Sequence, residues 1–184
     1  MRENNAGQSL LEVMIALSVL TAGFLGILSL LSQSLFISKT INNQIVATYL
    51  AEEGIEISKN LIDHDIYQTF DQPSFGGWFR NNPNTDPTFP TAADYQVDYT
   101  TCNGIGFDVL CGPAPNYTGS FLGFDPATGL YSYGGPMATP FTRKIHVIAS
   151  TPTEVDLQSI VSWSIGPFTS QNVILEDAFY NWHP

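Results

Sequence analysis

The feature that most constrains this fold is an uncharged apolar stretch near the N-terminus. Residues 13–38 carry no charged side chain, and Glu12 is the only charge between Glu3 and Lys39. An apolar run of about 18 residues or more without charges is long enough to cross a bilayer as a helix. We therefore expect a transmembrane helix over residues 8–36.

Two other interpretations of this stretch are weaker. The apolar core of a secretory signal peptide spans about 7–15 residues and ends at a small-residue cleavage site. The stretch over 13–38 is longer than that, and no such site follows it. A helix in the core of a soluble domain averages about 11–12 residues, which is also much shorter.

The helical pattern continues past the apolar stretch, over residues 37–62. Between Lys39 and Ile62 there is no proline and only one glycine. Small and apolar residues recur there at spacings of three and four, which is the period of one helix face. We expect this amphipathic half of the helix to cover a folded head along that stripe. The stripe comprises Ala47, Leu50, Ala51, Gly54, Ile55, Ser58, Leu61 and Ile62.

The remaining residues, 63–184, contain all 12 prolines and most of the strand and turn signals. Alternating apolar residues over 145–149, 155–165 and 173–182 indicate consecutive antiparallel strands. Residues 121–133 predict a hairpin, because the turn sequence Asp-Pro-Ala-Thr-Gly separates two apolar runs. The sequence thus predicts an α+β fold, in which a long N-terminal helix packs on an antiparallel β-sheet head.

The segment between the helix and the hairpin is expected to be largely loop, since it is rich in proline and asparagine. Within it, Tyr95, Val97 and Tyr99 alternate with polar residues. This alternation predicts one short strand.

Composition argues against two classes of function. The formal net charge is −11, and residues 63–184 hold 12 acidic against three basic residues. We do not expect a nucleic-acid partner, because neutralising phosphates requires lysine and arginine. A local basic patch at Arg143 and Lys144 is the exception left open. No nucleophile elbow, zinc-protease or phosphate-loop motif occurs, so the sequence indicates no enzyme, no metal site and no cofactor.

The start of the chain has a distinctive order of residues. A short polar leader ends at Gly7, and an apolar helix follows in which Glu12 is the fifth residue after that glycine. This pattern resembles the type III signal of type IV prepilins and type II secretion pseudopilins. The resemblance implies that the leader, residues 1–7, is cut off between Gly7 and Gln8 and that the new amine of Gln8 is methylated. It also implies a prepilin peptidase/methyltransferase, an inner-membrane pilus assembly platform, other pilin subunits and, before assembly, membrane lipid as partners.

Two features of the apolar helix bear on assembly. A carboxylate such as Glu12 costs about 2.5–3.5 kcal/mol inside a bilayer, so it needs a partner. The resemblance implies that this partner is the N-terminal amine of a neighbouring subunit; the alternative is that Glu12 only complements the helix dipole, by about 0.3–1 kcal/mol. Gly23 and Gly26 are candidate points for local unwinding, with close helix packing as the alternative.

Further segments extend the resemblance. Residues 47–56 follow the pattern A-x-x-L-A-x-E-G-I-E of minor pilins of the "V" and "I" kind. Residues 139–143, 161–163 and 175–182 resemble the β-meander of the same group. Most family members have phenylalanine where this chain has Gln8, and most major pilins have a proline in the apolar helix. These departures favour a minor over a major subunit.

Two candidate sites lie in the head. Cys102 and Cys111 enclose eight residues, and a head outside the cytoplasm, as the resemblance implies, favours a disulfide between them. A reactive or metal-binding pair is the alternative. Four aspartates could contribute to a Ca²⁺ site, although they lack EF-hand spacing. They are Asp86, Asp94, Asp98 and Asp108.

Taken together, these patterns predict a structural subunit of a type IV pilus-like filament. It would be a single-pass protein of the inner (cytoplasmic) membrane with its head outside the cytoplasm, and later part of an extracellular or periplasmic filament. The alternatives are a type II secretion pseudopilin, a competence or DNA-uptake pilin and, from another class, a membrane-anchored surface enzyme.

Overall fold

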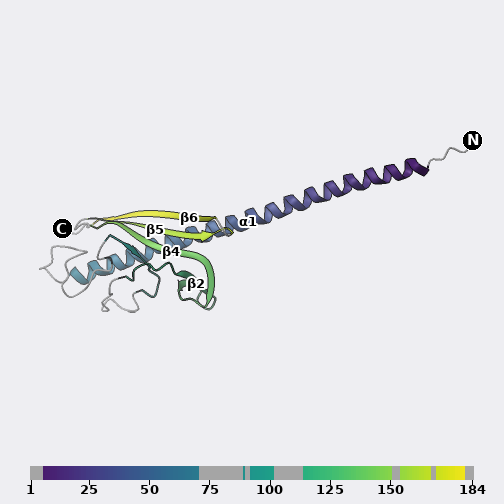
Figure 1. Cartoon of the computed structure of the whole chain (residues 1–184). Coiled ribbons are helices and arrows are strands. Elements are labelled where there is room, and N and C mark those ends of the chain that lie inside the picture. The colour runs from purple at the N-terminus through teal and green to yellow at the C-terminus, as the bar shows by residue number, and fades with distance from the viewer. Residues whose placement is uncertain are drawn as a thin grey trace, which may run out of the picture. The chain divides into compact units, whose positions relative to one another are not determined.

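A computed structural model gives the fold of the chain (Figure 1). It divides into two units, residues 1–43 and 44–184, which are taken separately below. The structure describes residues 6–70, 89, 92–101, 114–150, 154–166 and 169–180.

The long helix α1 spans Ala6–Phe70. It is long and apolar enough to cross a membrane, as the sequence predicts, and every side chain over 10–39 is exposed. The helix ends later than the predicted residue 62. No proline or glycine occurs between Gly54 and Pro73, so no helix-breaking residue interrupts it earlier.

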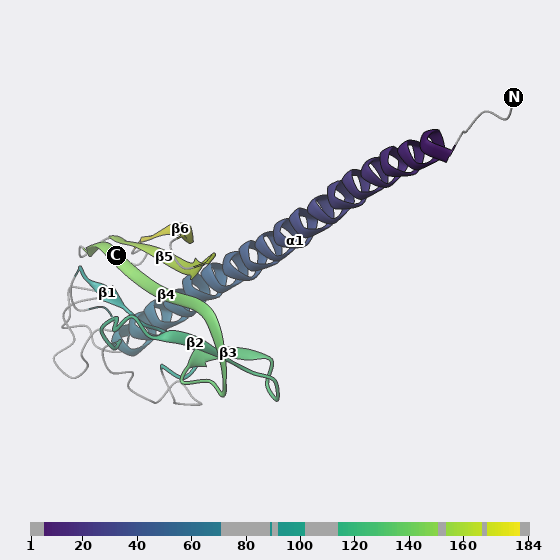
Figure 2. The same ribbon diagram turned by 45° about the vertical axis from the view of Figure 1, so that its right-hand side comes forward.

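The second unit contains one antiparallel sheet in the order β3-β2-β4-β5-β6, with β1 also pairing β4. The β2–β3 hairpin and β6 lie at opposite edges of it (Figure 2). The expected α+β arrangement of a helix on an antiparallel sheet is therefore confirmed. The strands are β1 (Asp94–Tyr95), β2 (Phe121–Asp125), β3 (Leu130–Tyr133), β4 (Met137–Ser150), β5 (Glu154–Ser164) and β6 (Ser170–Tyr180).

The predicted hairpin and meander are confirmed. In the β2–β3 turn, the Gly129 N–H donates to the carbonyl of Asp125 at 2.8 Å, and Gly129 has a φ of 74° that favours glycine. Strand β4 starts well before the predicted residue 145. Pro140 lies inside it without ending it, next to a register shift in the pairing of β4 with β2.

The predicted strand over 95–99 is shorter than expected. Only Asp94 and Tyr95 pair with β4, and the chain then turns, with the Thr101 N–H donating to the carbonyl of Asp98 at 3.0 Å. The alternation is lost in this turn. Asp98 is buried and Tyr99 is exposed, the reverse of what a continued alternation would give.

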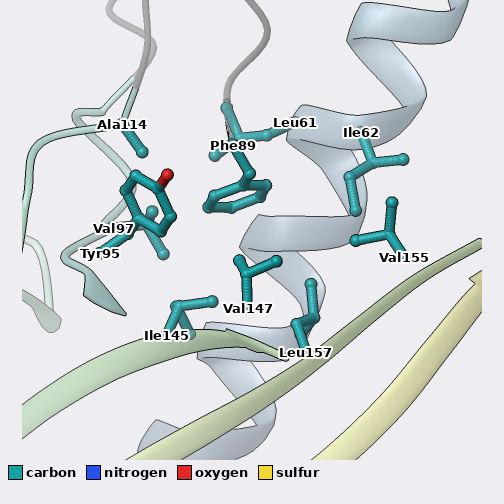
Figure 3. Packing of buried hydrophobic residues seen from close by; sticks show 10 residues of the cluster. All are labelled: Leu61, Ile62, Phe89, Tyr95, Val97, Ala114, Ile145, Val147, Val155 and Leu157. Carbon is teal, nitrogen blue, oxygen red and sulfur yellow. The ribbon is translucent and has the colours of Figure 1, made fainter. Parts of the chain in front are cut away.

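The core lies between the sheet and residues 47–62 of α1. Of the predicted helix stripe, every residue is buried except Ile55, which is half-buried. In one cluster the rings of Phe89 and Tyr95 meet edge to face, with centroids 5.3 Å apart (Figure 3). The second cluster contains Ala47, Leu50, Ala51, Leu122, Phe141, Val161 and Trp163.

Candidate functional site

The predicted processing residues lie at the beginning of α1. The helix starts at Ala6, so the backbones of Gly7 and Gln8 belong to its first turns. Glu12 is exposed and follows Gln8 by four residues, which places both on one helix face, one turn apart. Among the described residues, Glu12 has no ion-pair partner. Its carboxylate is therefore unpaired within the part of the chain that the structure describes.

The helix that follows Glu12 is mostly apolar and carries no further charge up to Lys39. Large apolar side chains are exposed all along the following residues, including Leu20 and Phe24. A Cβ added at Gly23 or Gly26 would meet no atom within 4 Å, and the helix runs through both glycines. Close packing at these glycines thus has no partner within the described part of the chain. Their role in unwinding stays a prediction.

A buried arginine joins three segments of the second unit. Arg143 of β4 has an exposed fraction of 0 %. Its Nη1 donates to the carbonyl of Leu50 at 2.9 Å and to Oε2 of Glu53 at 3.1 Å, both on α1. Its Nη2 donates to the carbonyl of Val97 at 2.7 Å. One side chain therefore ties the sheet to the helix and to the segment that follows β1.

The charge of Arg143 is tolerated because its partners are acceptors. A buried charge without partners destabilises the fold by several kcal/mol. Removing one partner of a buried ion pair, for example, costs roughly 3–5 kcal/mol of folding free energy. Here two carbonyls and Glu53 face the guanidinium, and the Glu53 side chain is still 29 % exposed. The Nε atom alone has no partner among the described residues.

Gly54 makes room for this contact. A Cβ at Gly54 would clash with Oγ of Ser159 and would lie 3.1 Å from Cδ of Arg143 and 3.2 Å from Cδ1 of Ile145. Only a residue without a side chain lets α1 come so close to β4 and β5. The glycine in the helix stripe is thus a point of close approach.

A second polar group supports Arg143 from the β3 side. The Tyr133 hydroxyl donates to the carbonyl of Arg143 at 2.6 Å, and burial raises the pKa of that hydroxyl to about 12. The Tyr133 N–H donates to Oδ2 of Asp98 at 2.8 Å. The other oxygen of Asp98 accepts from the N–H and the hydroxyl of Thr100. Asp98 is thus engaged in the fold and does not present a free ligand for Ca²⁺.

The opposite face of the sheet carries a small ion-pair group. Asp94 lies 2.8 Å from Nζ of Lys144 and 2.6 Å from Nδ1 of His146. The hydrogen bond from Lys144 holds the pKa of the Asp94 carboxyl below its usual value, ahead of the weaker effect of His146. The basic patch left open by the sequence is not formed, because Arg143 is buried and Lys144 is paired with Asp94.

The remaining sequence candidates fall outside the described residues. These are Cys102 and Cys111, whose pairing stays a prediction, and the aspartates at 86 and 108. Within the part of the chain that is described, no group of three histidine, cysteine, aspartate or glutamate side chains could hold a metal ion.

Sequence reasoning missed Arg143 as a central residue. A signal was present, since residues 141, 143, 145 and 147 share one face of a strand by the period of two. Arg143 therefore had to lie among apolar neighbours such as Phe141 and Ile145. The segments 47–56, 139–143 and 161–163, which carry the second part of the resemblance, meet here in one interface.

Comparison with known proteins yields no relative. No protein-family model, no curated protein and no solved structure matches the chain. The N-terminal sequence and the geometry described above therefore carry the functional conclusion.

Proposed function

We propose that the chain is a structural subunit of a type IV pilus-like filament, of the minor-pilin kind. It is held in the inner membrane by the first half of α1, with its head outside the cytoplasm. The peptidase/methyltransferase cuts after Gly7 and methylates Gln8, and the assembly platform then moves the subunit from lipid into an extracellular or periplasmic filament of similar subunits. The protein is not an enzyme and needs no cofactor.

The lone carboxylate of Glu12 carries this proposal. It is the only charge in the exposed apolar part of α1, and it lies one turn from the amine that cleavage at Gly7 would create at Gln8. Placing a carboxylate in a bilayer costs about 2.5–3.5 kcal/mol, and pairing with an amine offsets that cost. A neighbouring subunit whose amine pairs with Glu12 would also set the axial register of the two helices.

The apolar surface of the same helix supports a second step of the proposal. Residues 10–37 expose large apolar side chains around the whole helix, and such a surface is unstable in water. Lipid covers it before assembly, and helices of other subunits cover it in the filament. Both environments accept the same surface, so transfer between them needs no conformational change of this half beyond the local unwinding expected at Gly23 and Gly26.

The head supports a structural role rather than nucleic-acid uptake. Arg143 is buried and Lys144 is paired with Asp94, so the one candidate basic patch is missing. A type II secretion pseudopilin shares every motif named above and stays the alternative. Deleting the gene separates the two: loss of surface filaments supports a pilus subunit, and loss of protein secretion with filaments intact supports a pseudopilin.

N-terminal mass spectrometry of sheared surface filaments tests processing and assembly together. We expect a peptide that begins at Gln8 and carries one methyl group. Finding only uncut chain, held in the membrane fraction, would contradict the proposal and favour a membrane-anchored surface protein of another class. A Gly7→Val variant should stay uncut, since a bulkier residue obstructs the peptidase.

Glu12→Ala tests the pairing step by itself. We expect this variant to be cut and methylated normally but to be absent from filaments, because the neighbour's amine loses its partner. The matched control is Glu52→Ala, which removes an exposed acid from α1 outside the apolar stretch and should enter filaments normally. Normal incorporation of Glu12→Ala would leave only the helix-dipole role for this residue.

A further inference from the structure

Strand β6 forms a long free edge of the sheet. It pairs with β5 over eleven consecutive residue pairs without a register shift, from Glu154↔Tyr180 to Ser164↔Ser170. No strand of the described chain pairs with its other side (Figure 1). The backbone N–H and C=O groups along that side are therefore a ready template for one more strand.

This edge lacks most of the devices that usually prevent strand addition. Natural edges are kept short or carry charged side chains (lysine above all), proline or a bulge, and the only charges of β6 are Glu176 and Asp177. β6 is longer than the usual five or six residues, has no proline, glycine or lysine, and exposes Ile174 by 50 %. The opposite edge strand, β3, has only four residues. The sheet is thus protected at one edge and open at the other.

The open edge is acidic. Glu176 and Asp177 are consecutive in β6, so they point to opposite faces of the sheet. On the face of Glu176, Gln158 donates to its Oε2 at 2.7 Å, and Asp156 and Glu154 continue the row of acids along β5. Burial, followed by repulsion from Glu154, raises the pKa of the Asp156 carboxyl. Neither β5 nor β6 contains a lysine or arginine to balance these charges.

The described strands of a second copy of the chain do not supply that balance. The chain has six lysine and arginine residues in all. In the described strands they are only Arg143 and Lys144, which lie in β4 between two other strands and already have partners. The free edges of a second copy, its β3 and β6, carry no base. The described strands of a second copy thus offer no basic complement to β6, which favours another polypeptide as the source of an added strand.

We infer that the free edge of β6 binds an extended segment of a partner protein that carries lysine or arginine, by adding it to the sheet as a further strand. Backbone hydrogen bonds provide the affinity, and two consecutive basic residues opposite Glu176 and Asp177 provide the selectivity, one on each face. The inference does not depend on cleavage at Gly7 or on filament assembly.

Peptide binding to the full-length chain in non-ionic detergent tests this edge. The probe is a fluorescent peptide as long as β6, with alternating threonine and valine and two central lysines. Two matched peptides have glutamates in place of the lysines, or a proline at the centre. We expect the lysine peptide to bind at least about tenfold more tightly than either and to weaken as salt rises. Equal binding of the proline peptide would exclude strand addition, and equal binding of the glutamate peptide would exclude charge selection.

Charge reversal on the protein side locates the site. The double variant Glu176→Lys/Asp177→Lys should lose the preference for the lysine peptide and should favour the glutamate peptide. The matched control, Glu52→Lys/Glu56→Lys, reverses two exposed acids on α1 and should bind as the unmodified chain does. An unchanged preference in the β6 variant overturns the inference. The inference is also overturned if the unmodified chain self-associates and Ile174→Lys abolishes that self-association, because β6 would then bind a second copy.

Discussion

Residues 10–39 and 47–62 belong to one helix, yet their apolar side chains have opposite environments. In the first stretch Leu31 is 57 % exposed and its apolar neighbours are exposed on all sides. In the second, Leu50 is only 2 % exposed, because small and apolar residues form one stripe against the sheet. The two stretches differ in the pattern of apolar residues, not in helical structure.

This difference shows where each stretch finds its partner. A stripe of period 3.6 can be covered by one sheet, so the second stretch completes a core within its own chain. An apolar surface around the whole helix cannot be covered by one neighbour, so the first stretch depends on lipid or on other chains. Substitutions that affect only one stretch should therefore separate folding from membrane insertion and assembly.

The largest effect is expected for Arg143→Ala, which removes the link between the packed stretch and the sheet. The carbonyls of Leu50 and Val97 and the carboxylate of Glu53 lose their donor, and we expect a loss of about 3–5 kcal/mol in the free energy of unfolding. Urea unfolding of the full chain in detergent, followed by tryptophan fluorescence, measures it. Lys144→Ala, which breaks only an exposed pair, should cost below about 1 kcal/mol. Equal losses for the two variants would contradict the importance of the buried arginine.

A leucine pair compares the two stretches directly. Leu50→Ala leaves a cavity in the second cluster and should lower the free energy of unfolding of the head by about 3 kcal/mol. Leu31→Ala makes the same chemical change where the side chain has no partner in the chain, and it should leave that free energy unchanged. The same unfolding experiment measures both, and a comparable loss for Leu31→Ala would remove the distinction between the stretches.

Alkaline pH probes the group that supports the buried arginine. The pKa of Tyr133 is raised to about 12 in the fold, against about 10 in an unfolded chain. The stability that this hydroxyl contributes is present below pH 10 and is lost as the pH rises to about 12, by about 2 kcal/mol. Unfolding measured across this window should show a weaker pH dependence for Tyr133→Phe. Identical alkaline profiles for the two chains would rule out the effect.

The smallest change in the free energy of unfolding is expected for Gly54→Ala, where α1 comes closest to β4 and β5. Gly54→Ala gains about 1 kcal/mol of helix propensity but places a Cβ against Ser159, Arg143 and Ile145, where overpacking costs about 1–3 kcal/mol. We expect a net loss of about 1 kcal/mol. In a Ser159→Ala background the clash with Oγ is gone, so the same substitution should cost less or stabilise the head. If the two substitutions change the free energy of unfolding independently and additively, the Cβ added at position 54 does not contact Ser159.

Local patterns explain what could be predicted from sequence. The buried stripe of α1, the hairpin over 121–133 and the β4–β5–β6 meander all follow from periods and turn residues within short segments. The spacing of Gly7 and Glu12 is local in the same way. Such features can be predicted without knowing which distant segments of the chain contact each other.

Long-range contacts explain what could not. Arg143 is separated by 93 residues from Leu50 and by 46 from Val97, so its hydrogen-bond acceptors depend on a tertiary arrangement that no local pattern encodes, although the period of two indicates its face of β4. The same holds for Asp98, whose carboxylate is buried because the N–H of Tyr133 reaches it from 35 residues away. Charged side chains are usually exposed, yet Arg143 and Asp98 are both buried.

The two shortest hydrogen bonds donated by the Arg143 guanidinium end on main-chain carbonyls, and this has a genetic consequence. Any residue at position 50 or 97 keeps its carbonyl oxygen, so point mutations there change packing but do not delete the acceptor. A codon change at position 143 removes the donor of every one of these bonds, whereas one at position 53 removes only the carboxylate acceptor. Second-site suppressors of an Arg143 variant should accordingly arise at residues that fill or solvate the space left by the arginine. They should not arise at positions 50 and 97, where a new side chain leaves the carbonyl unchanged.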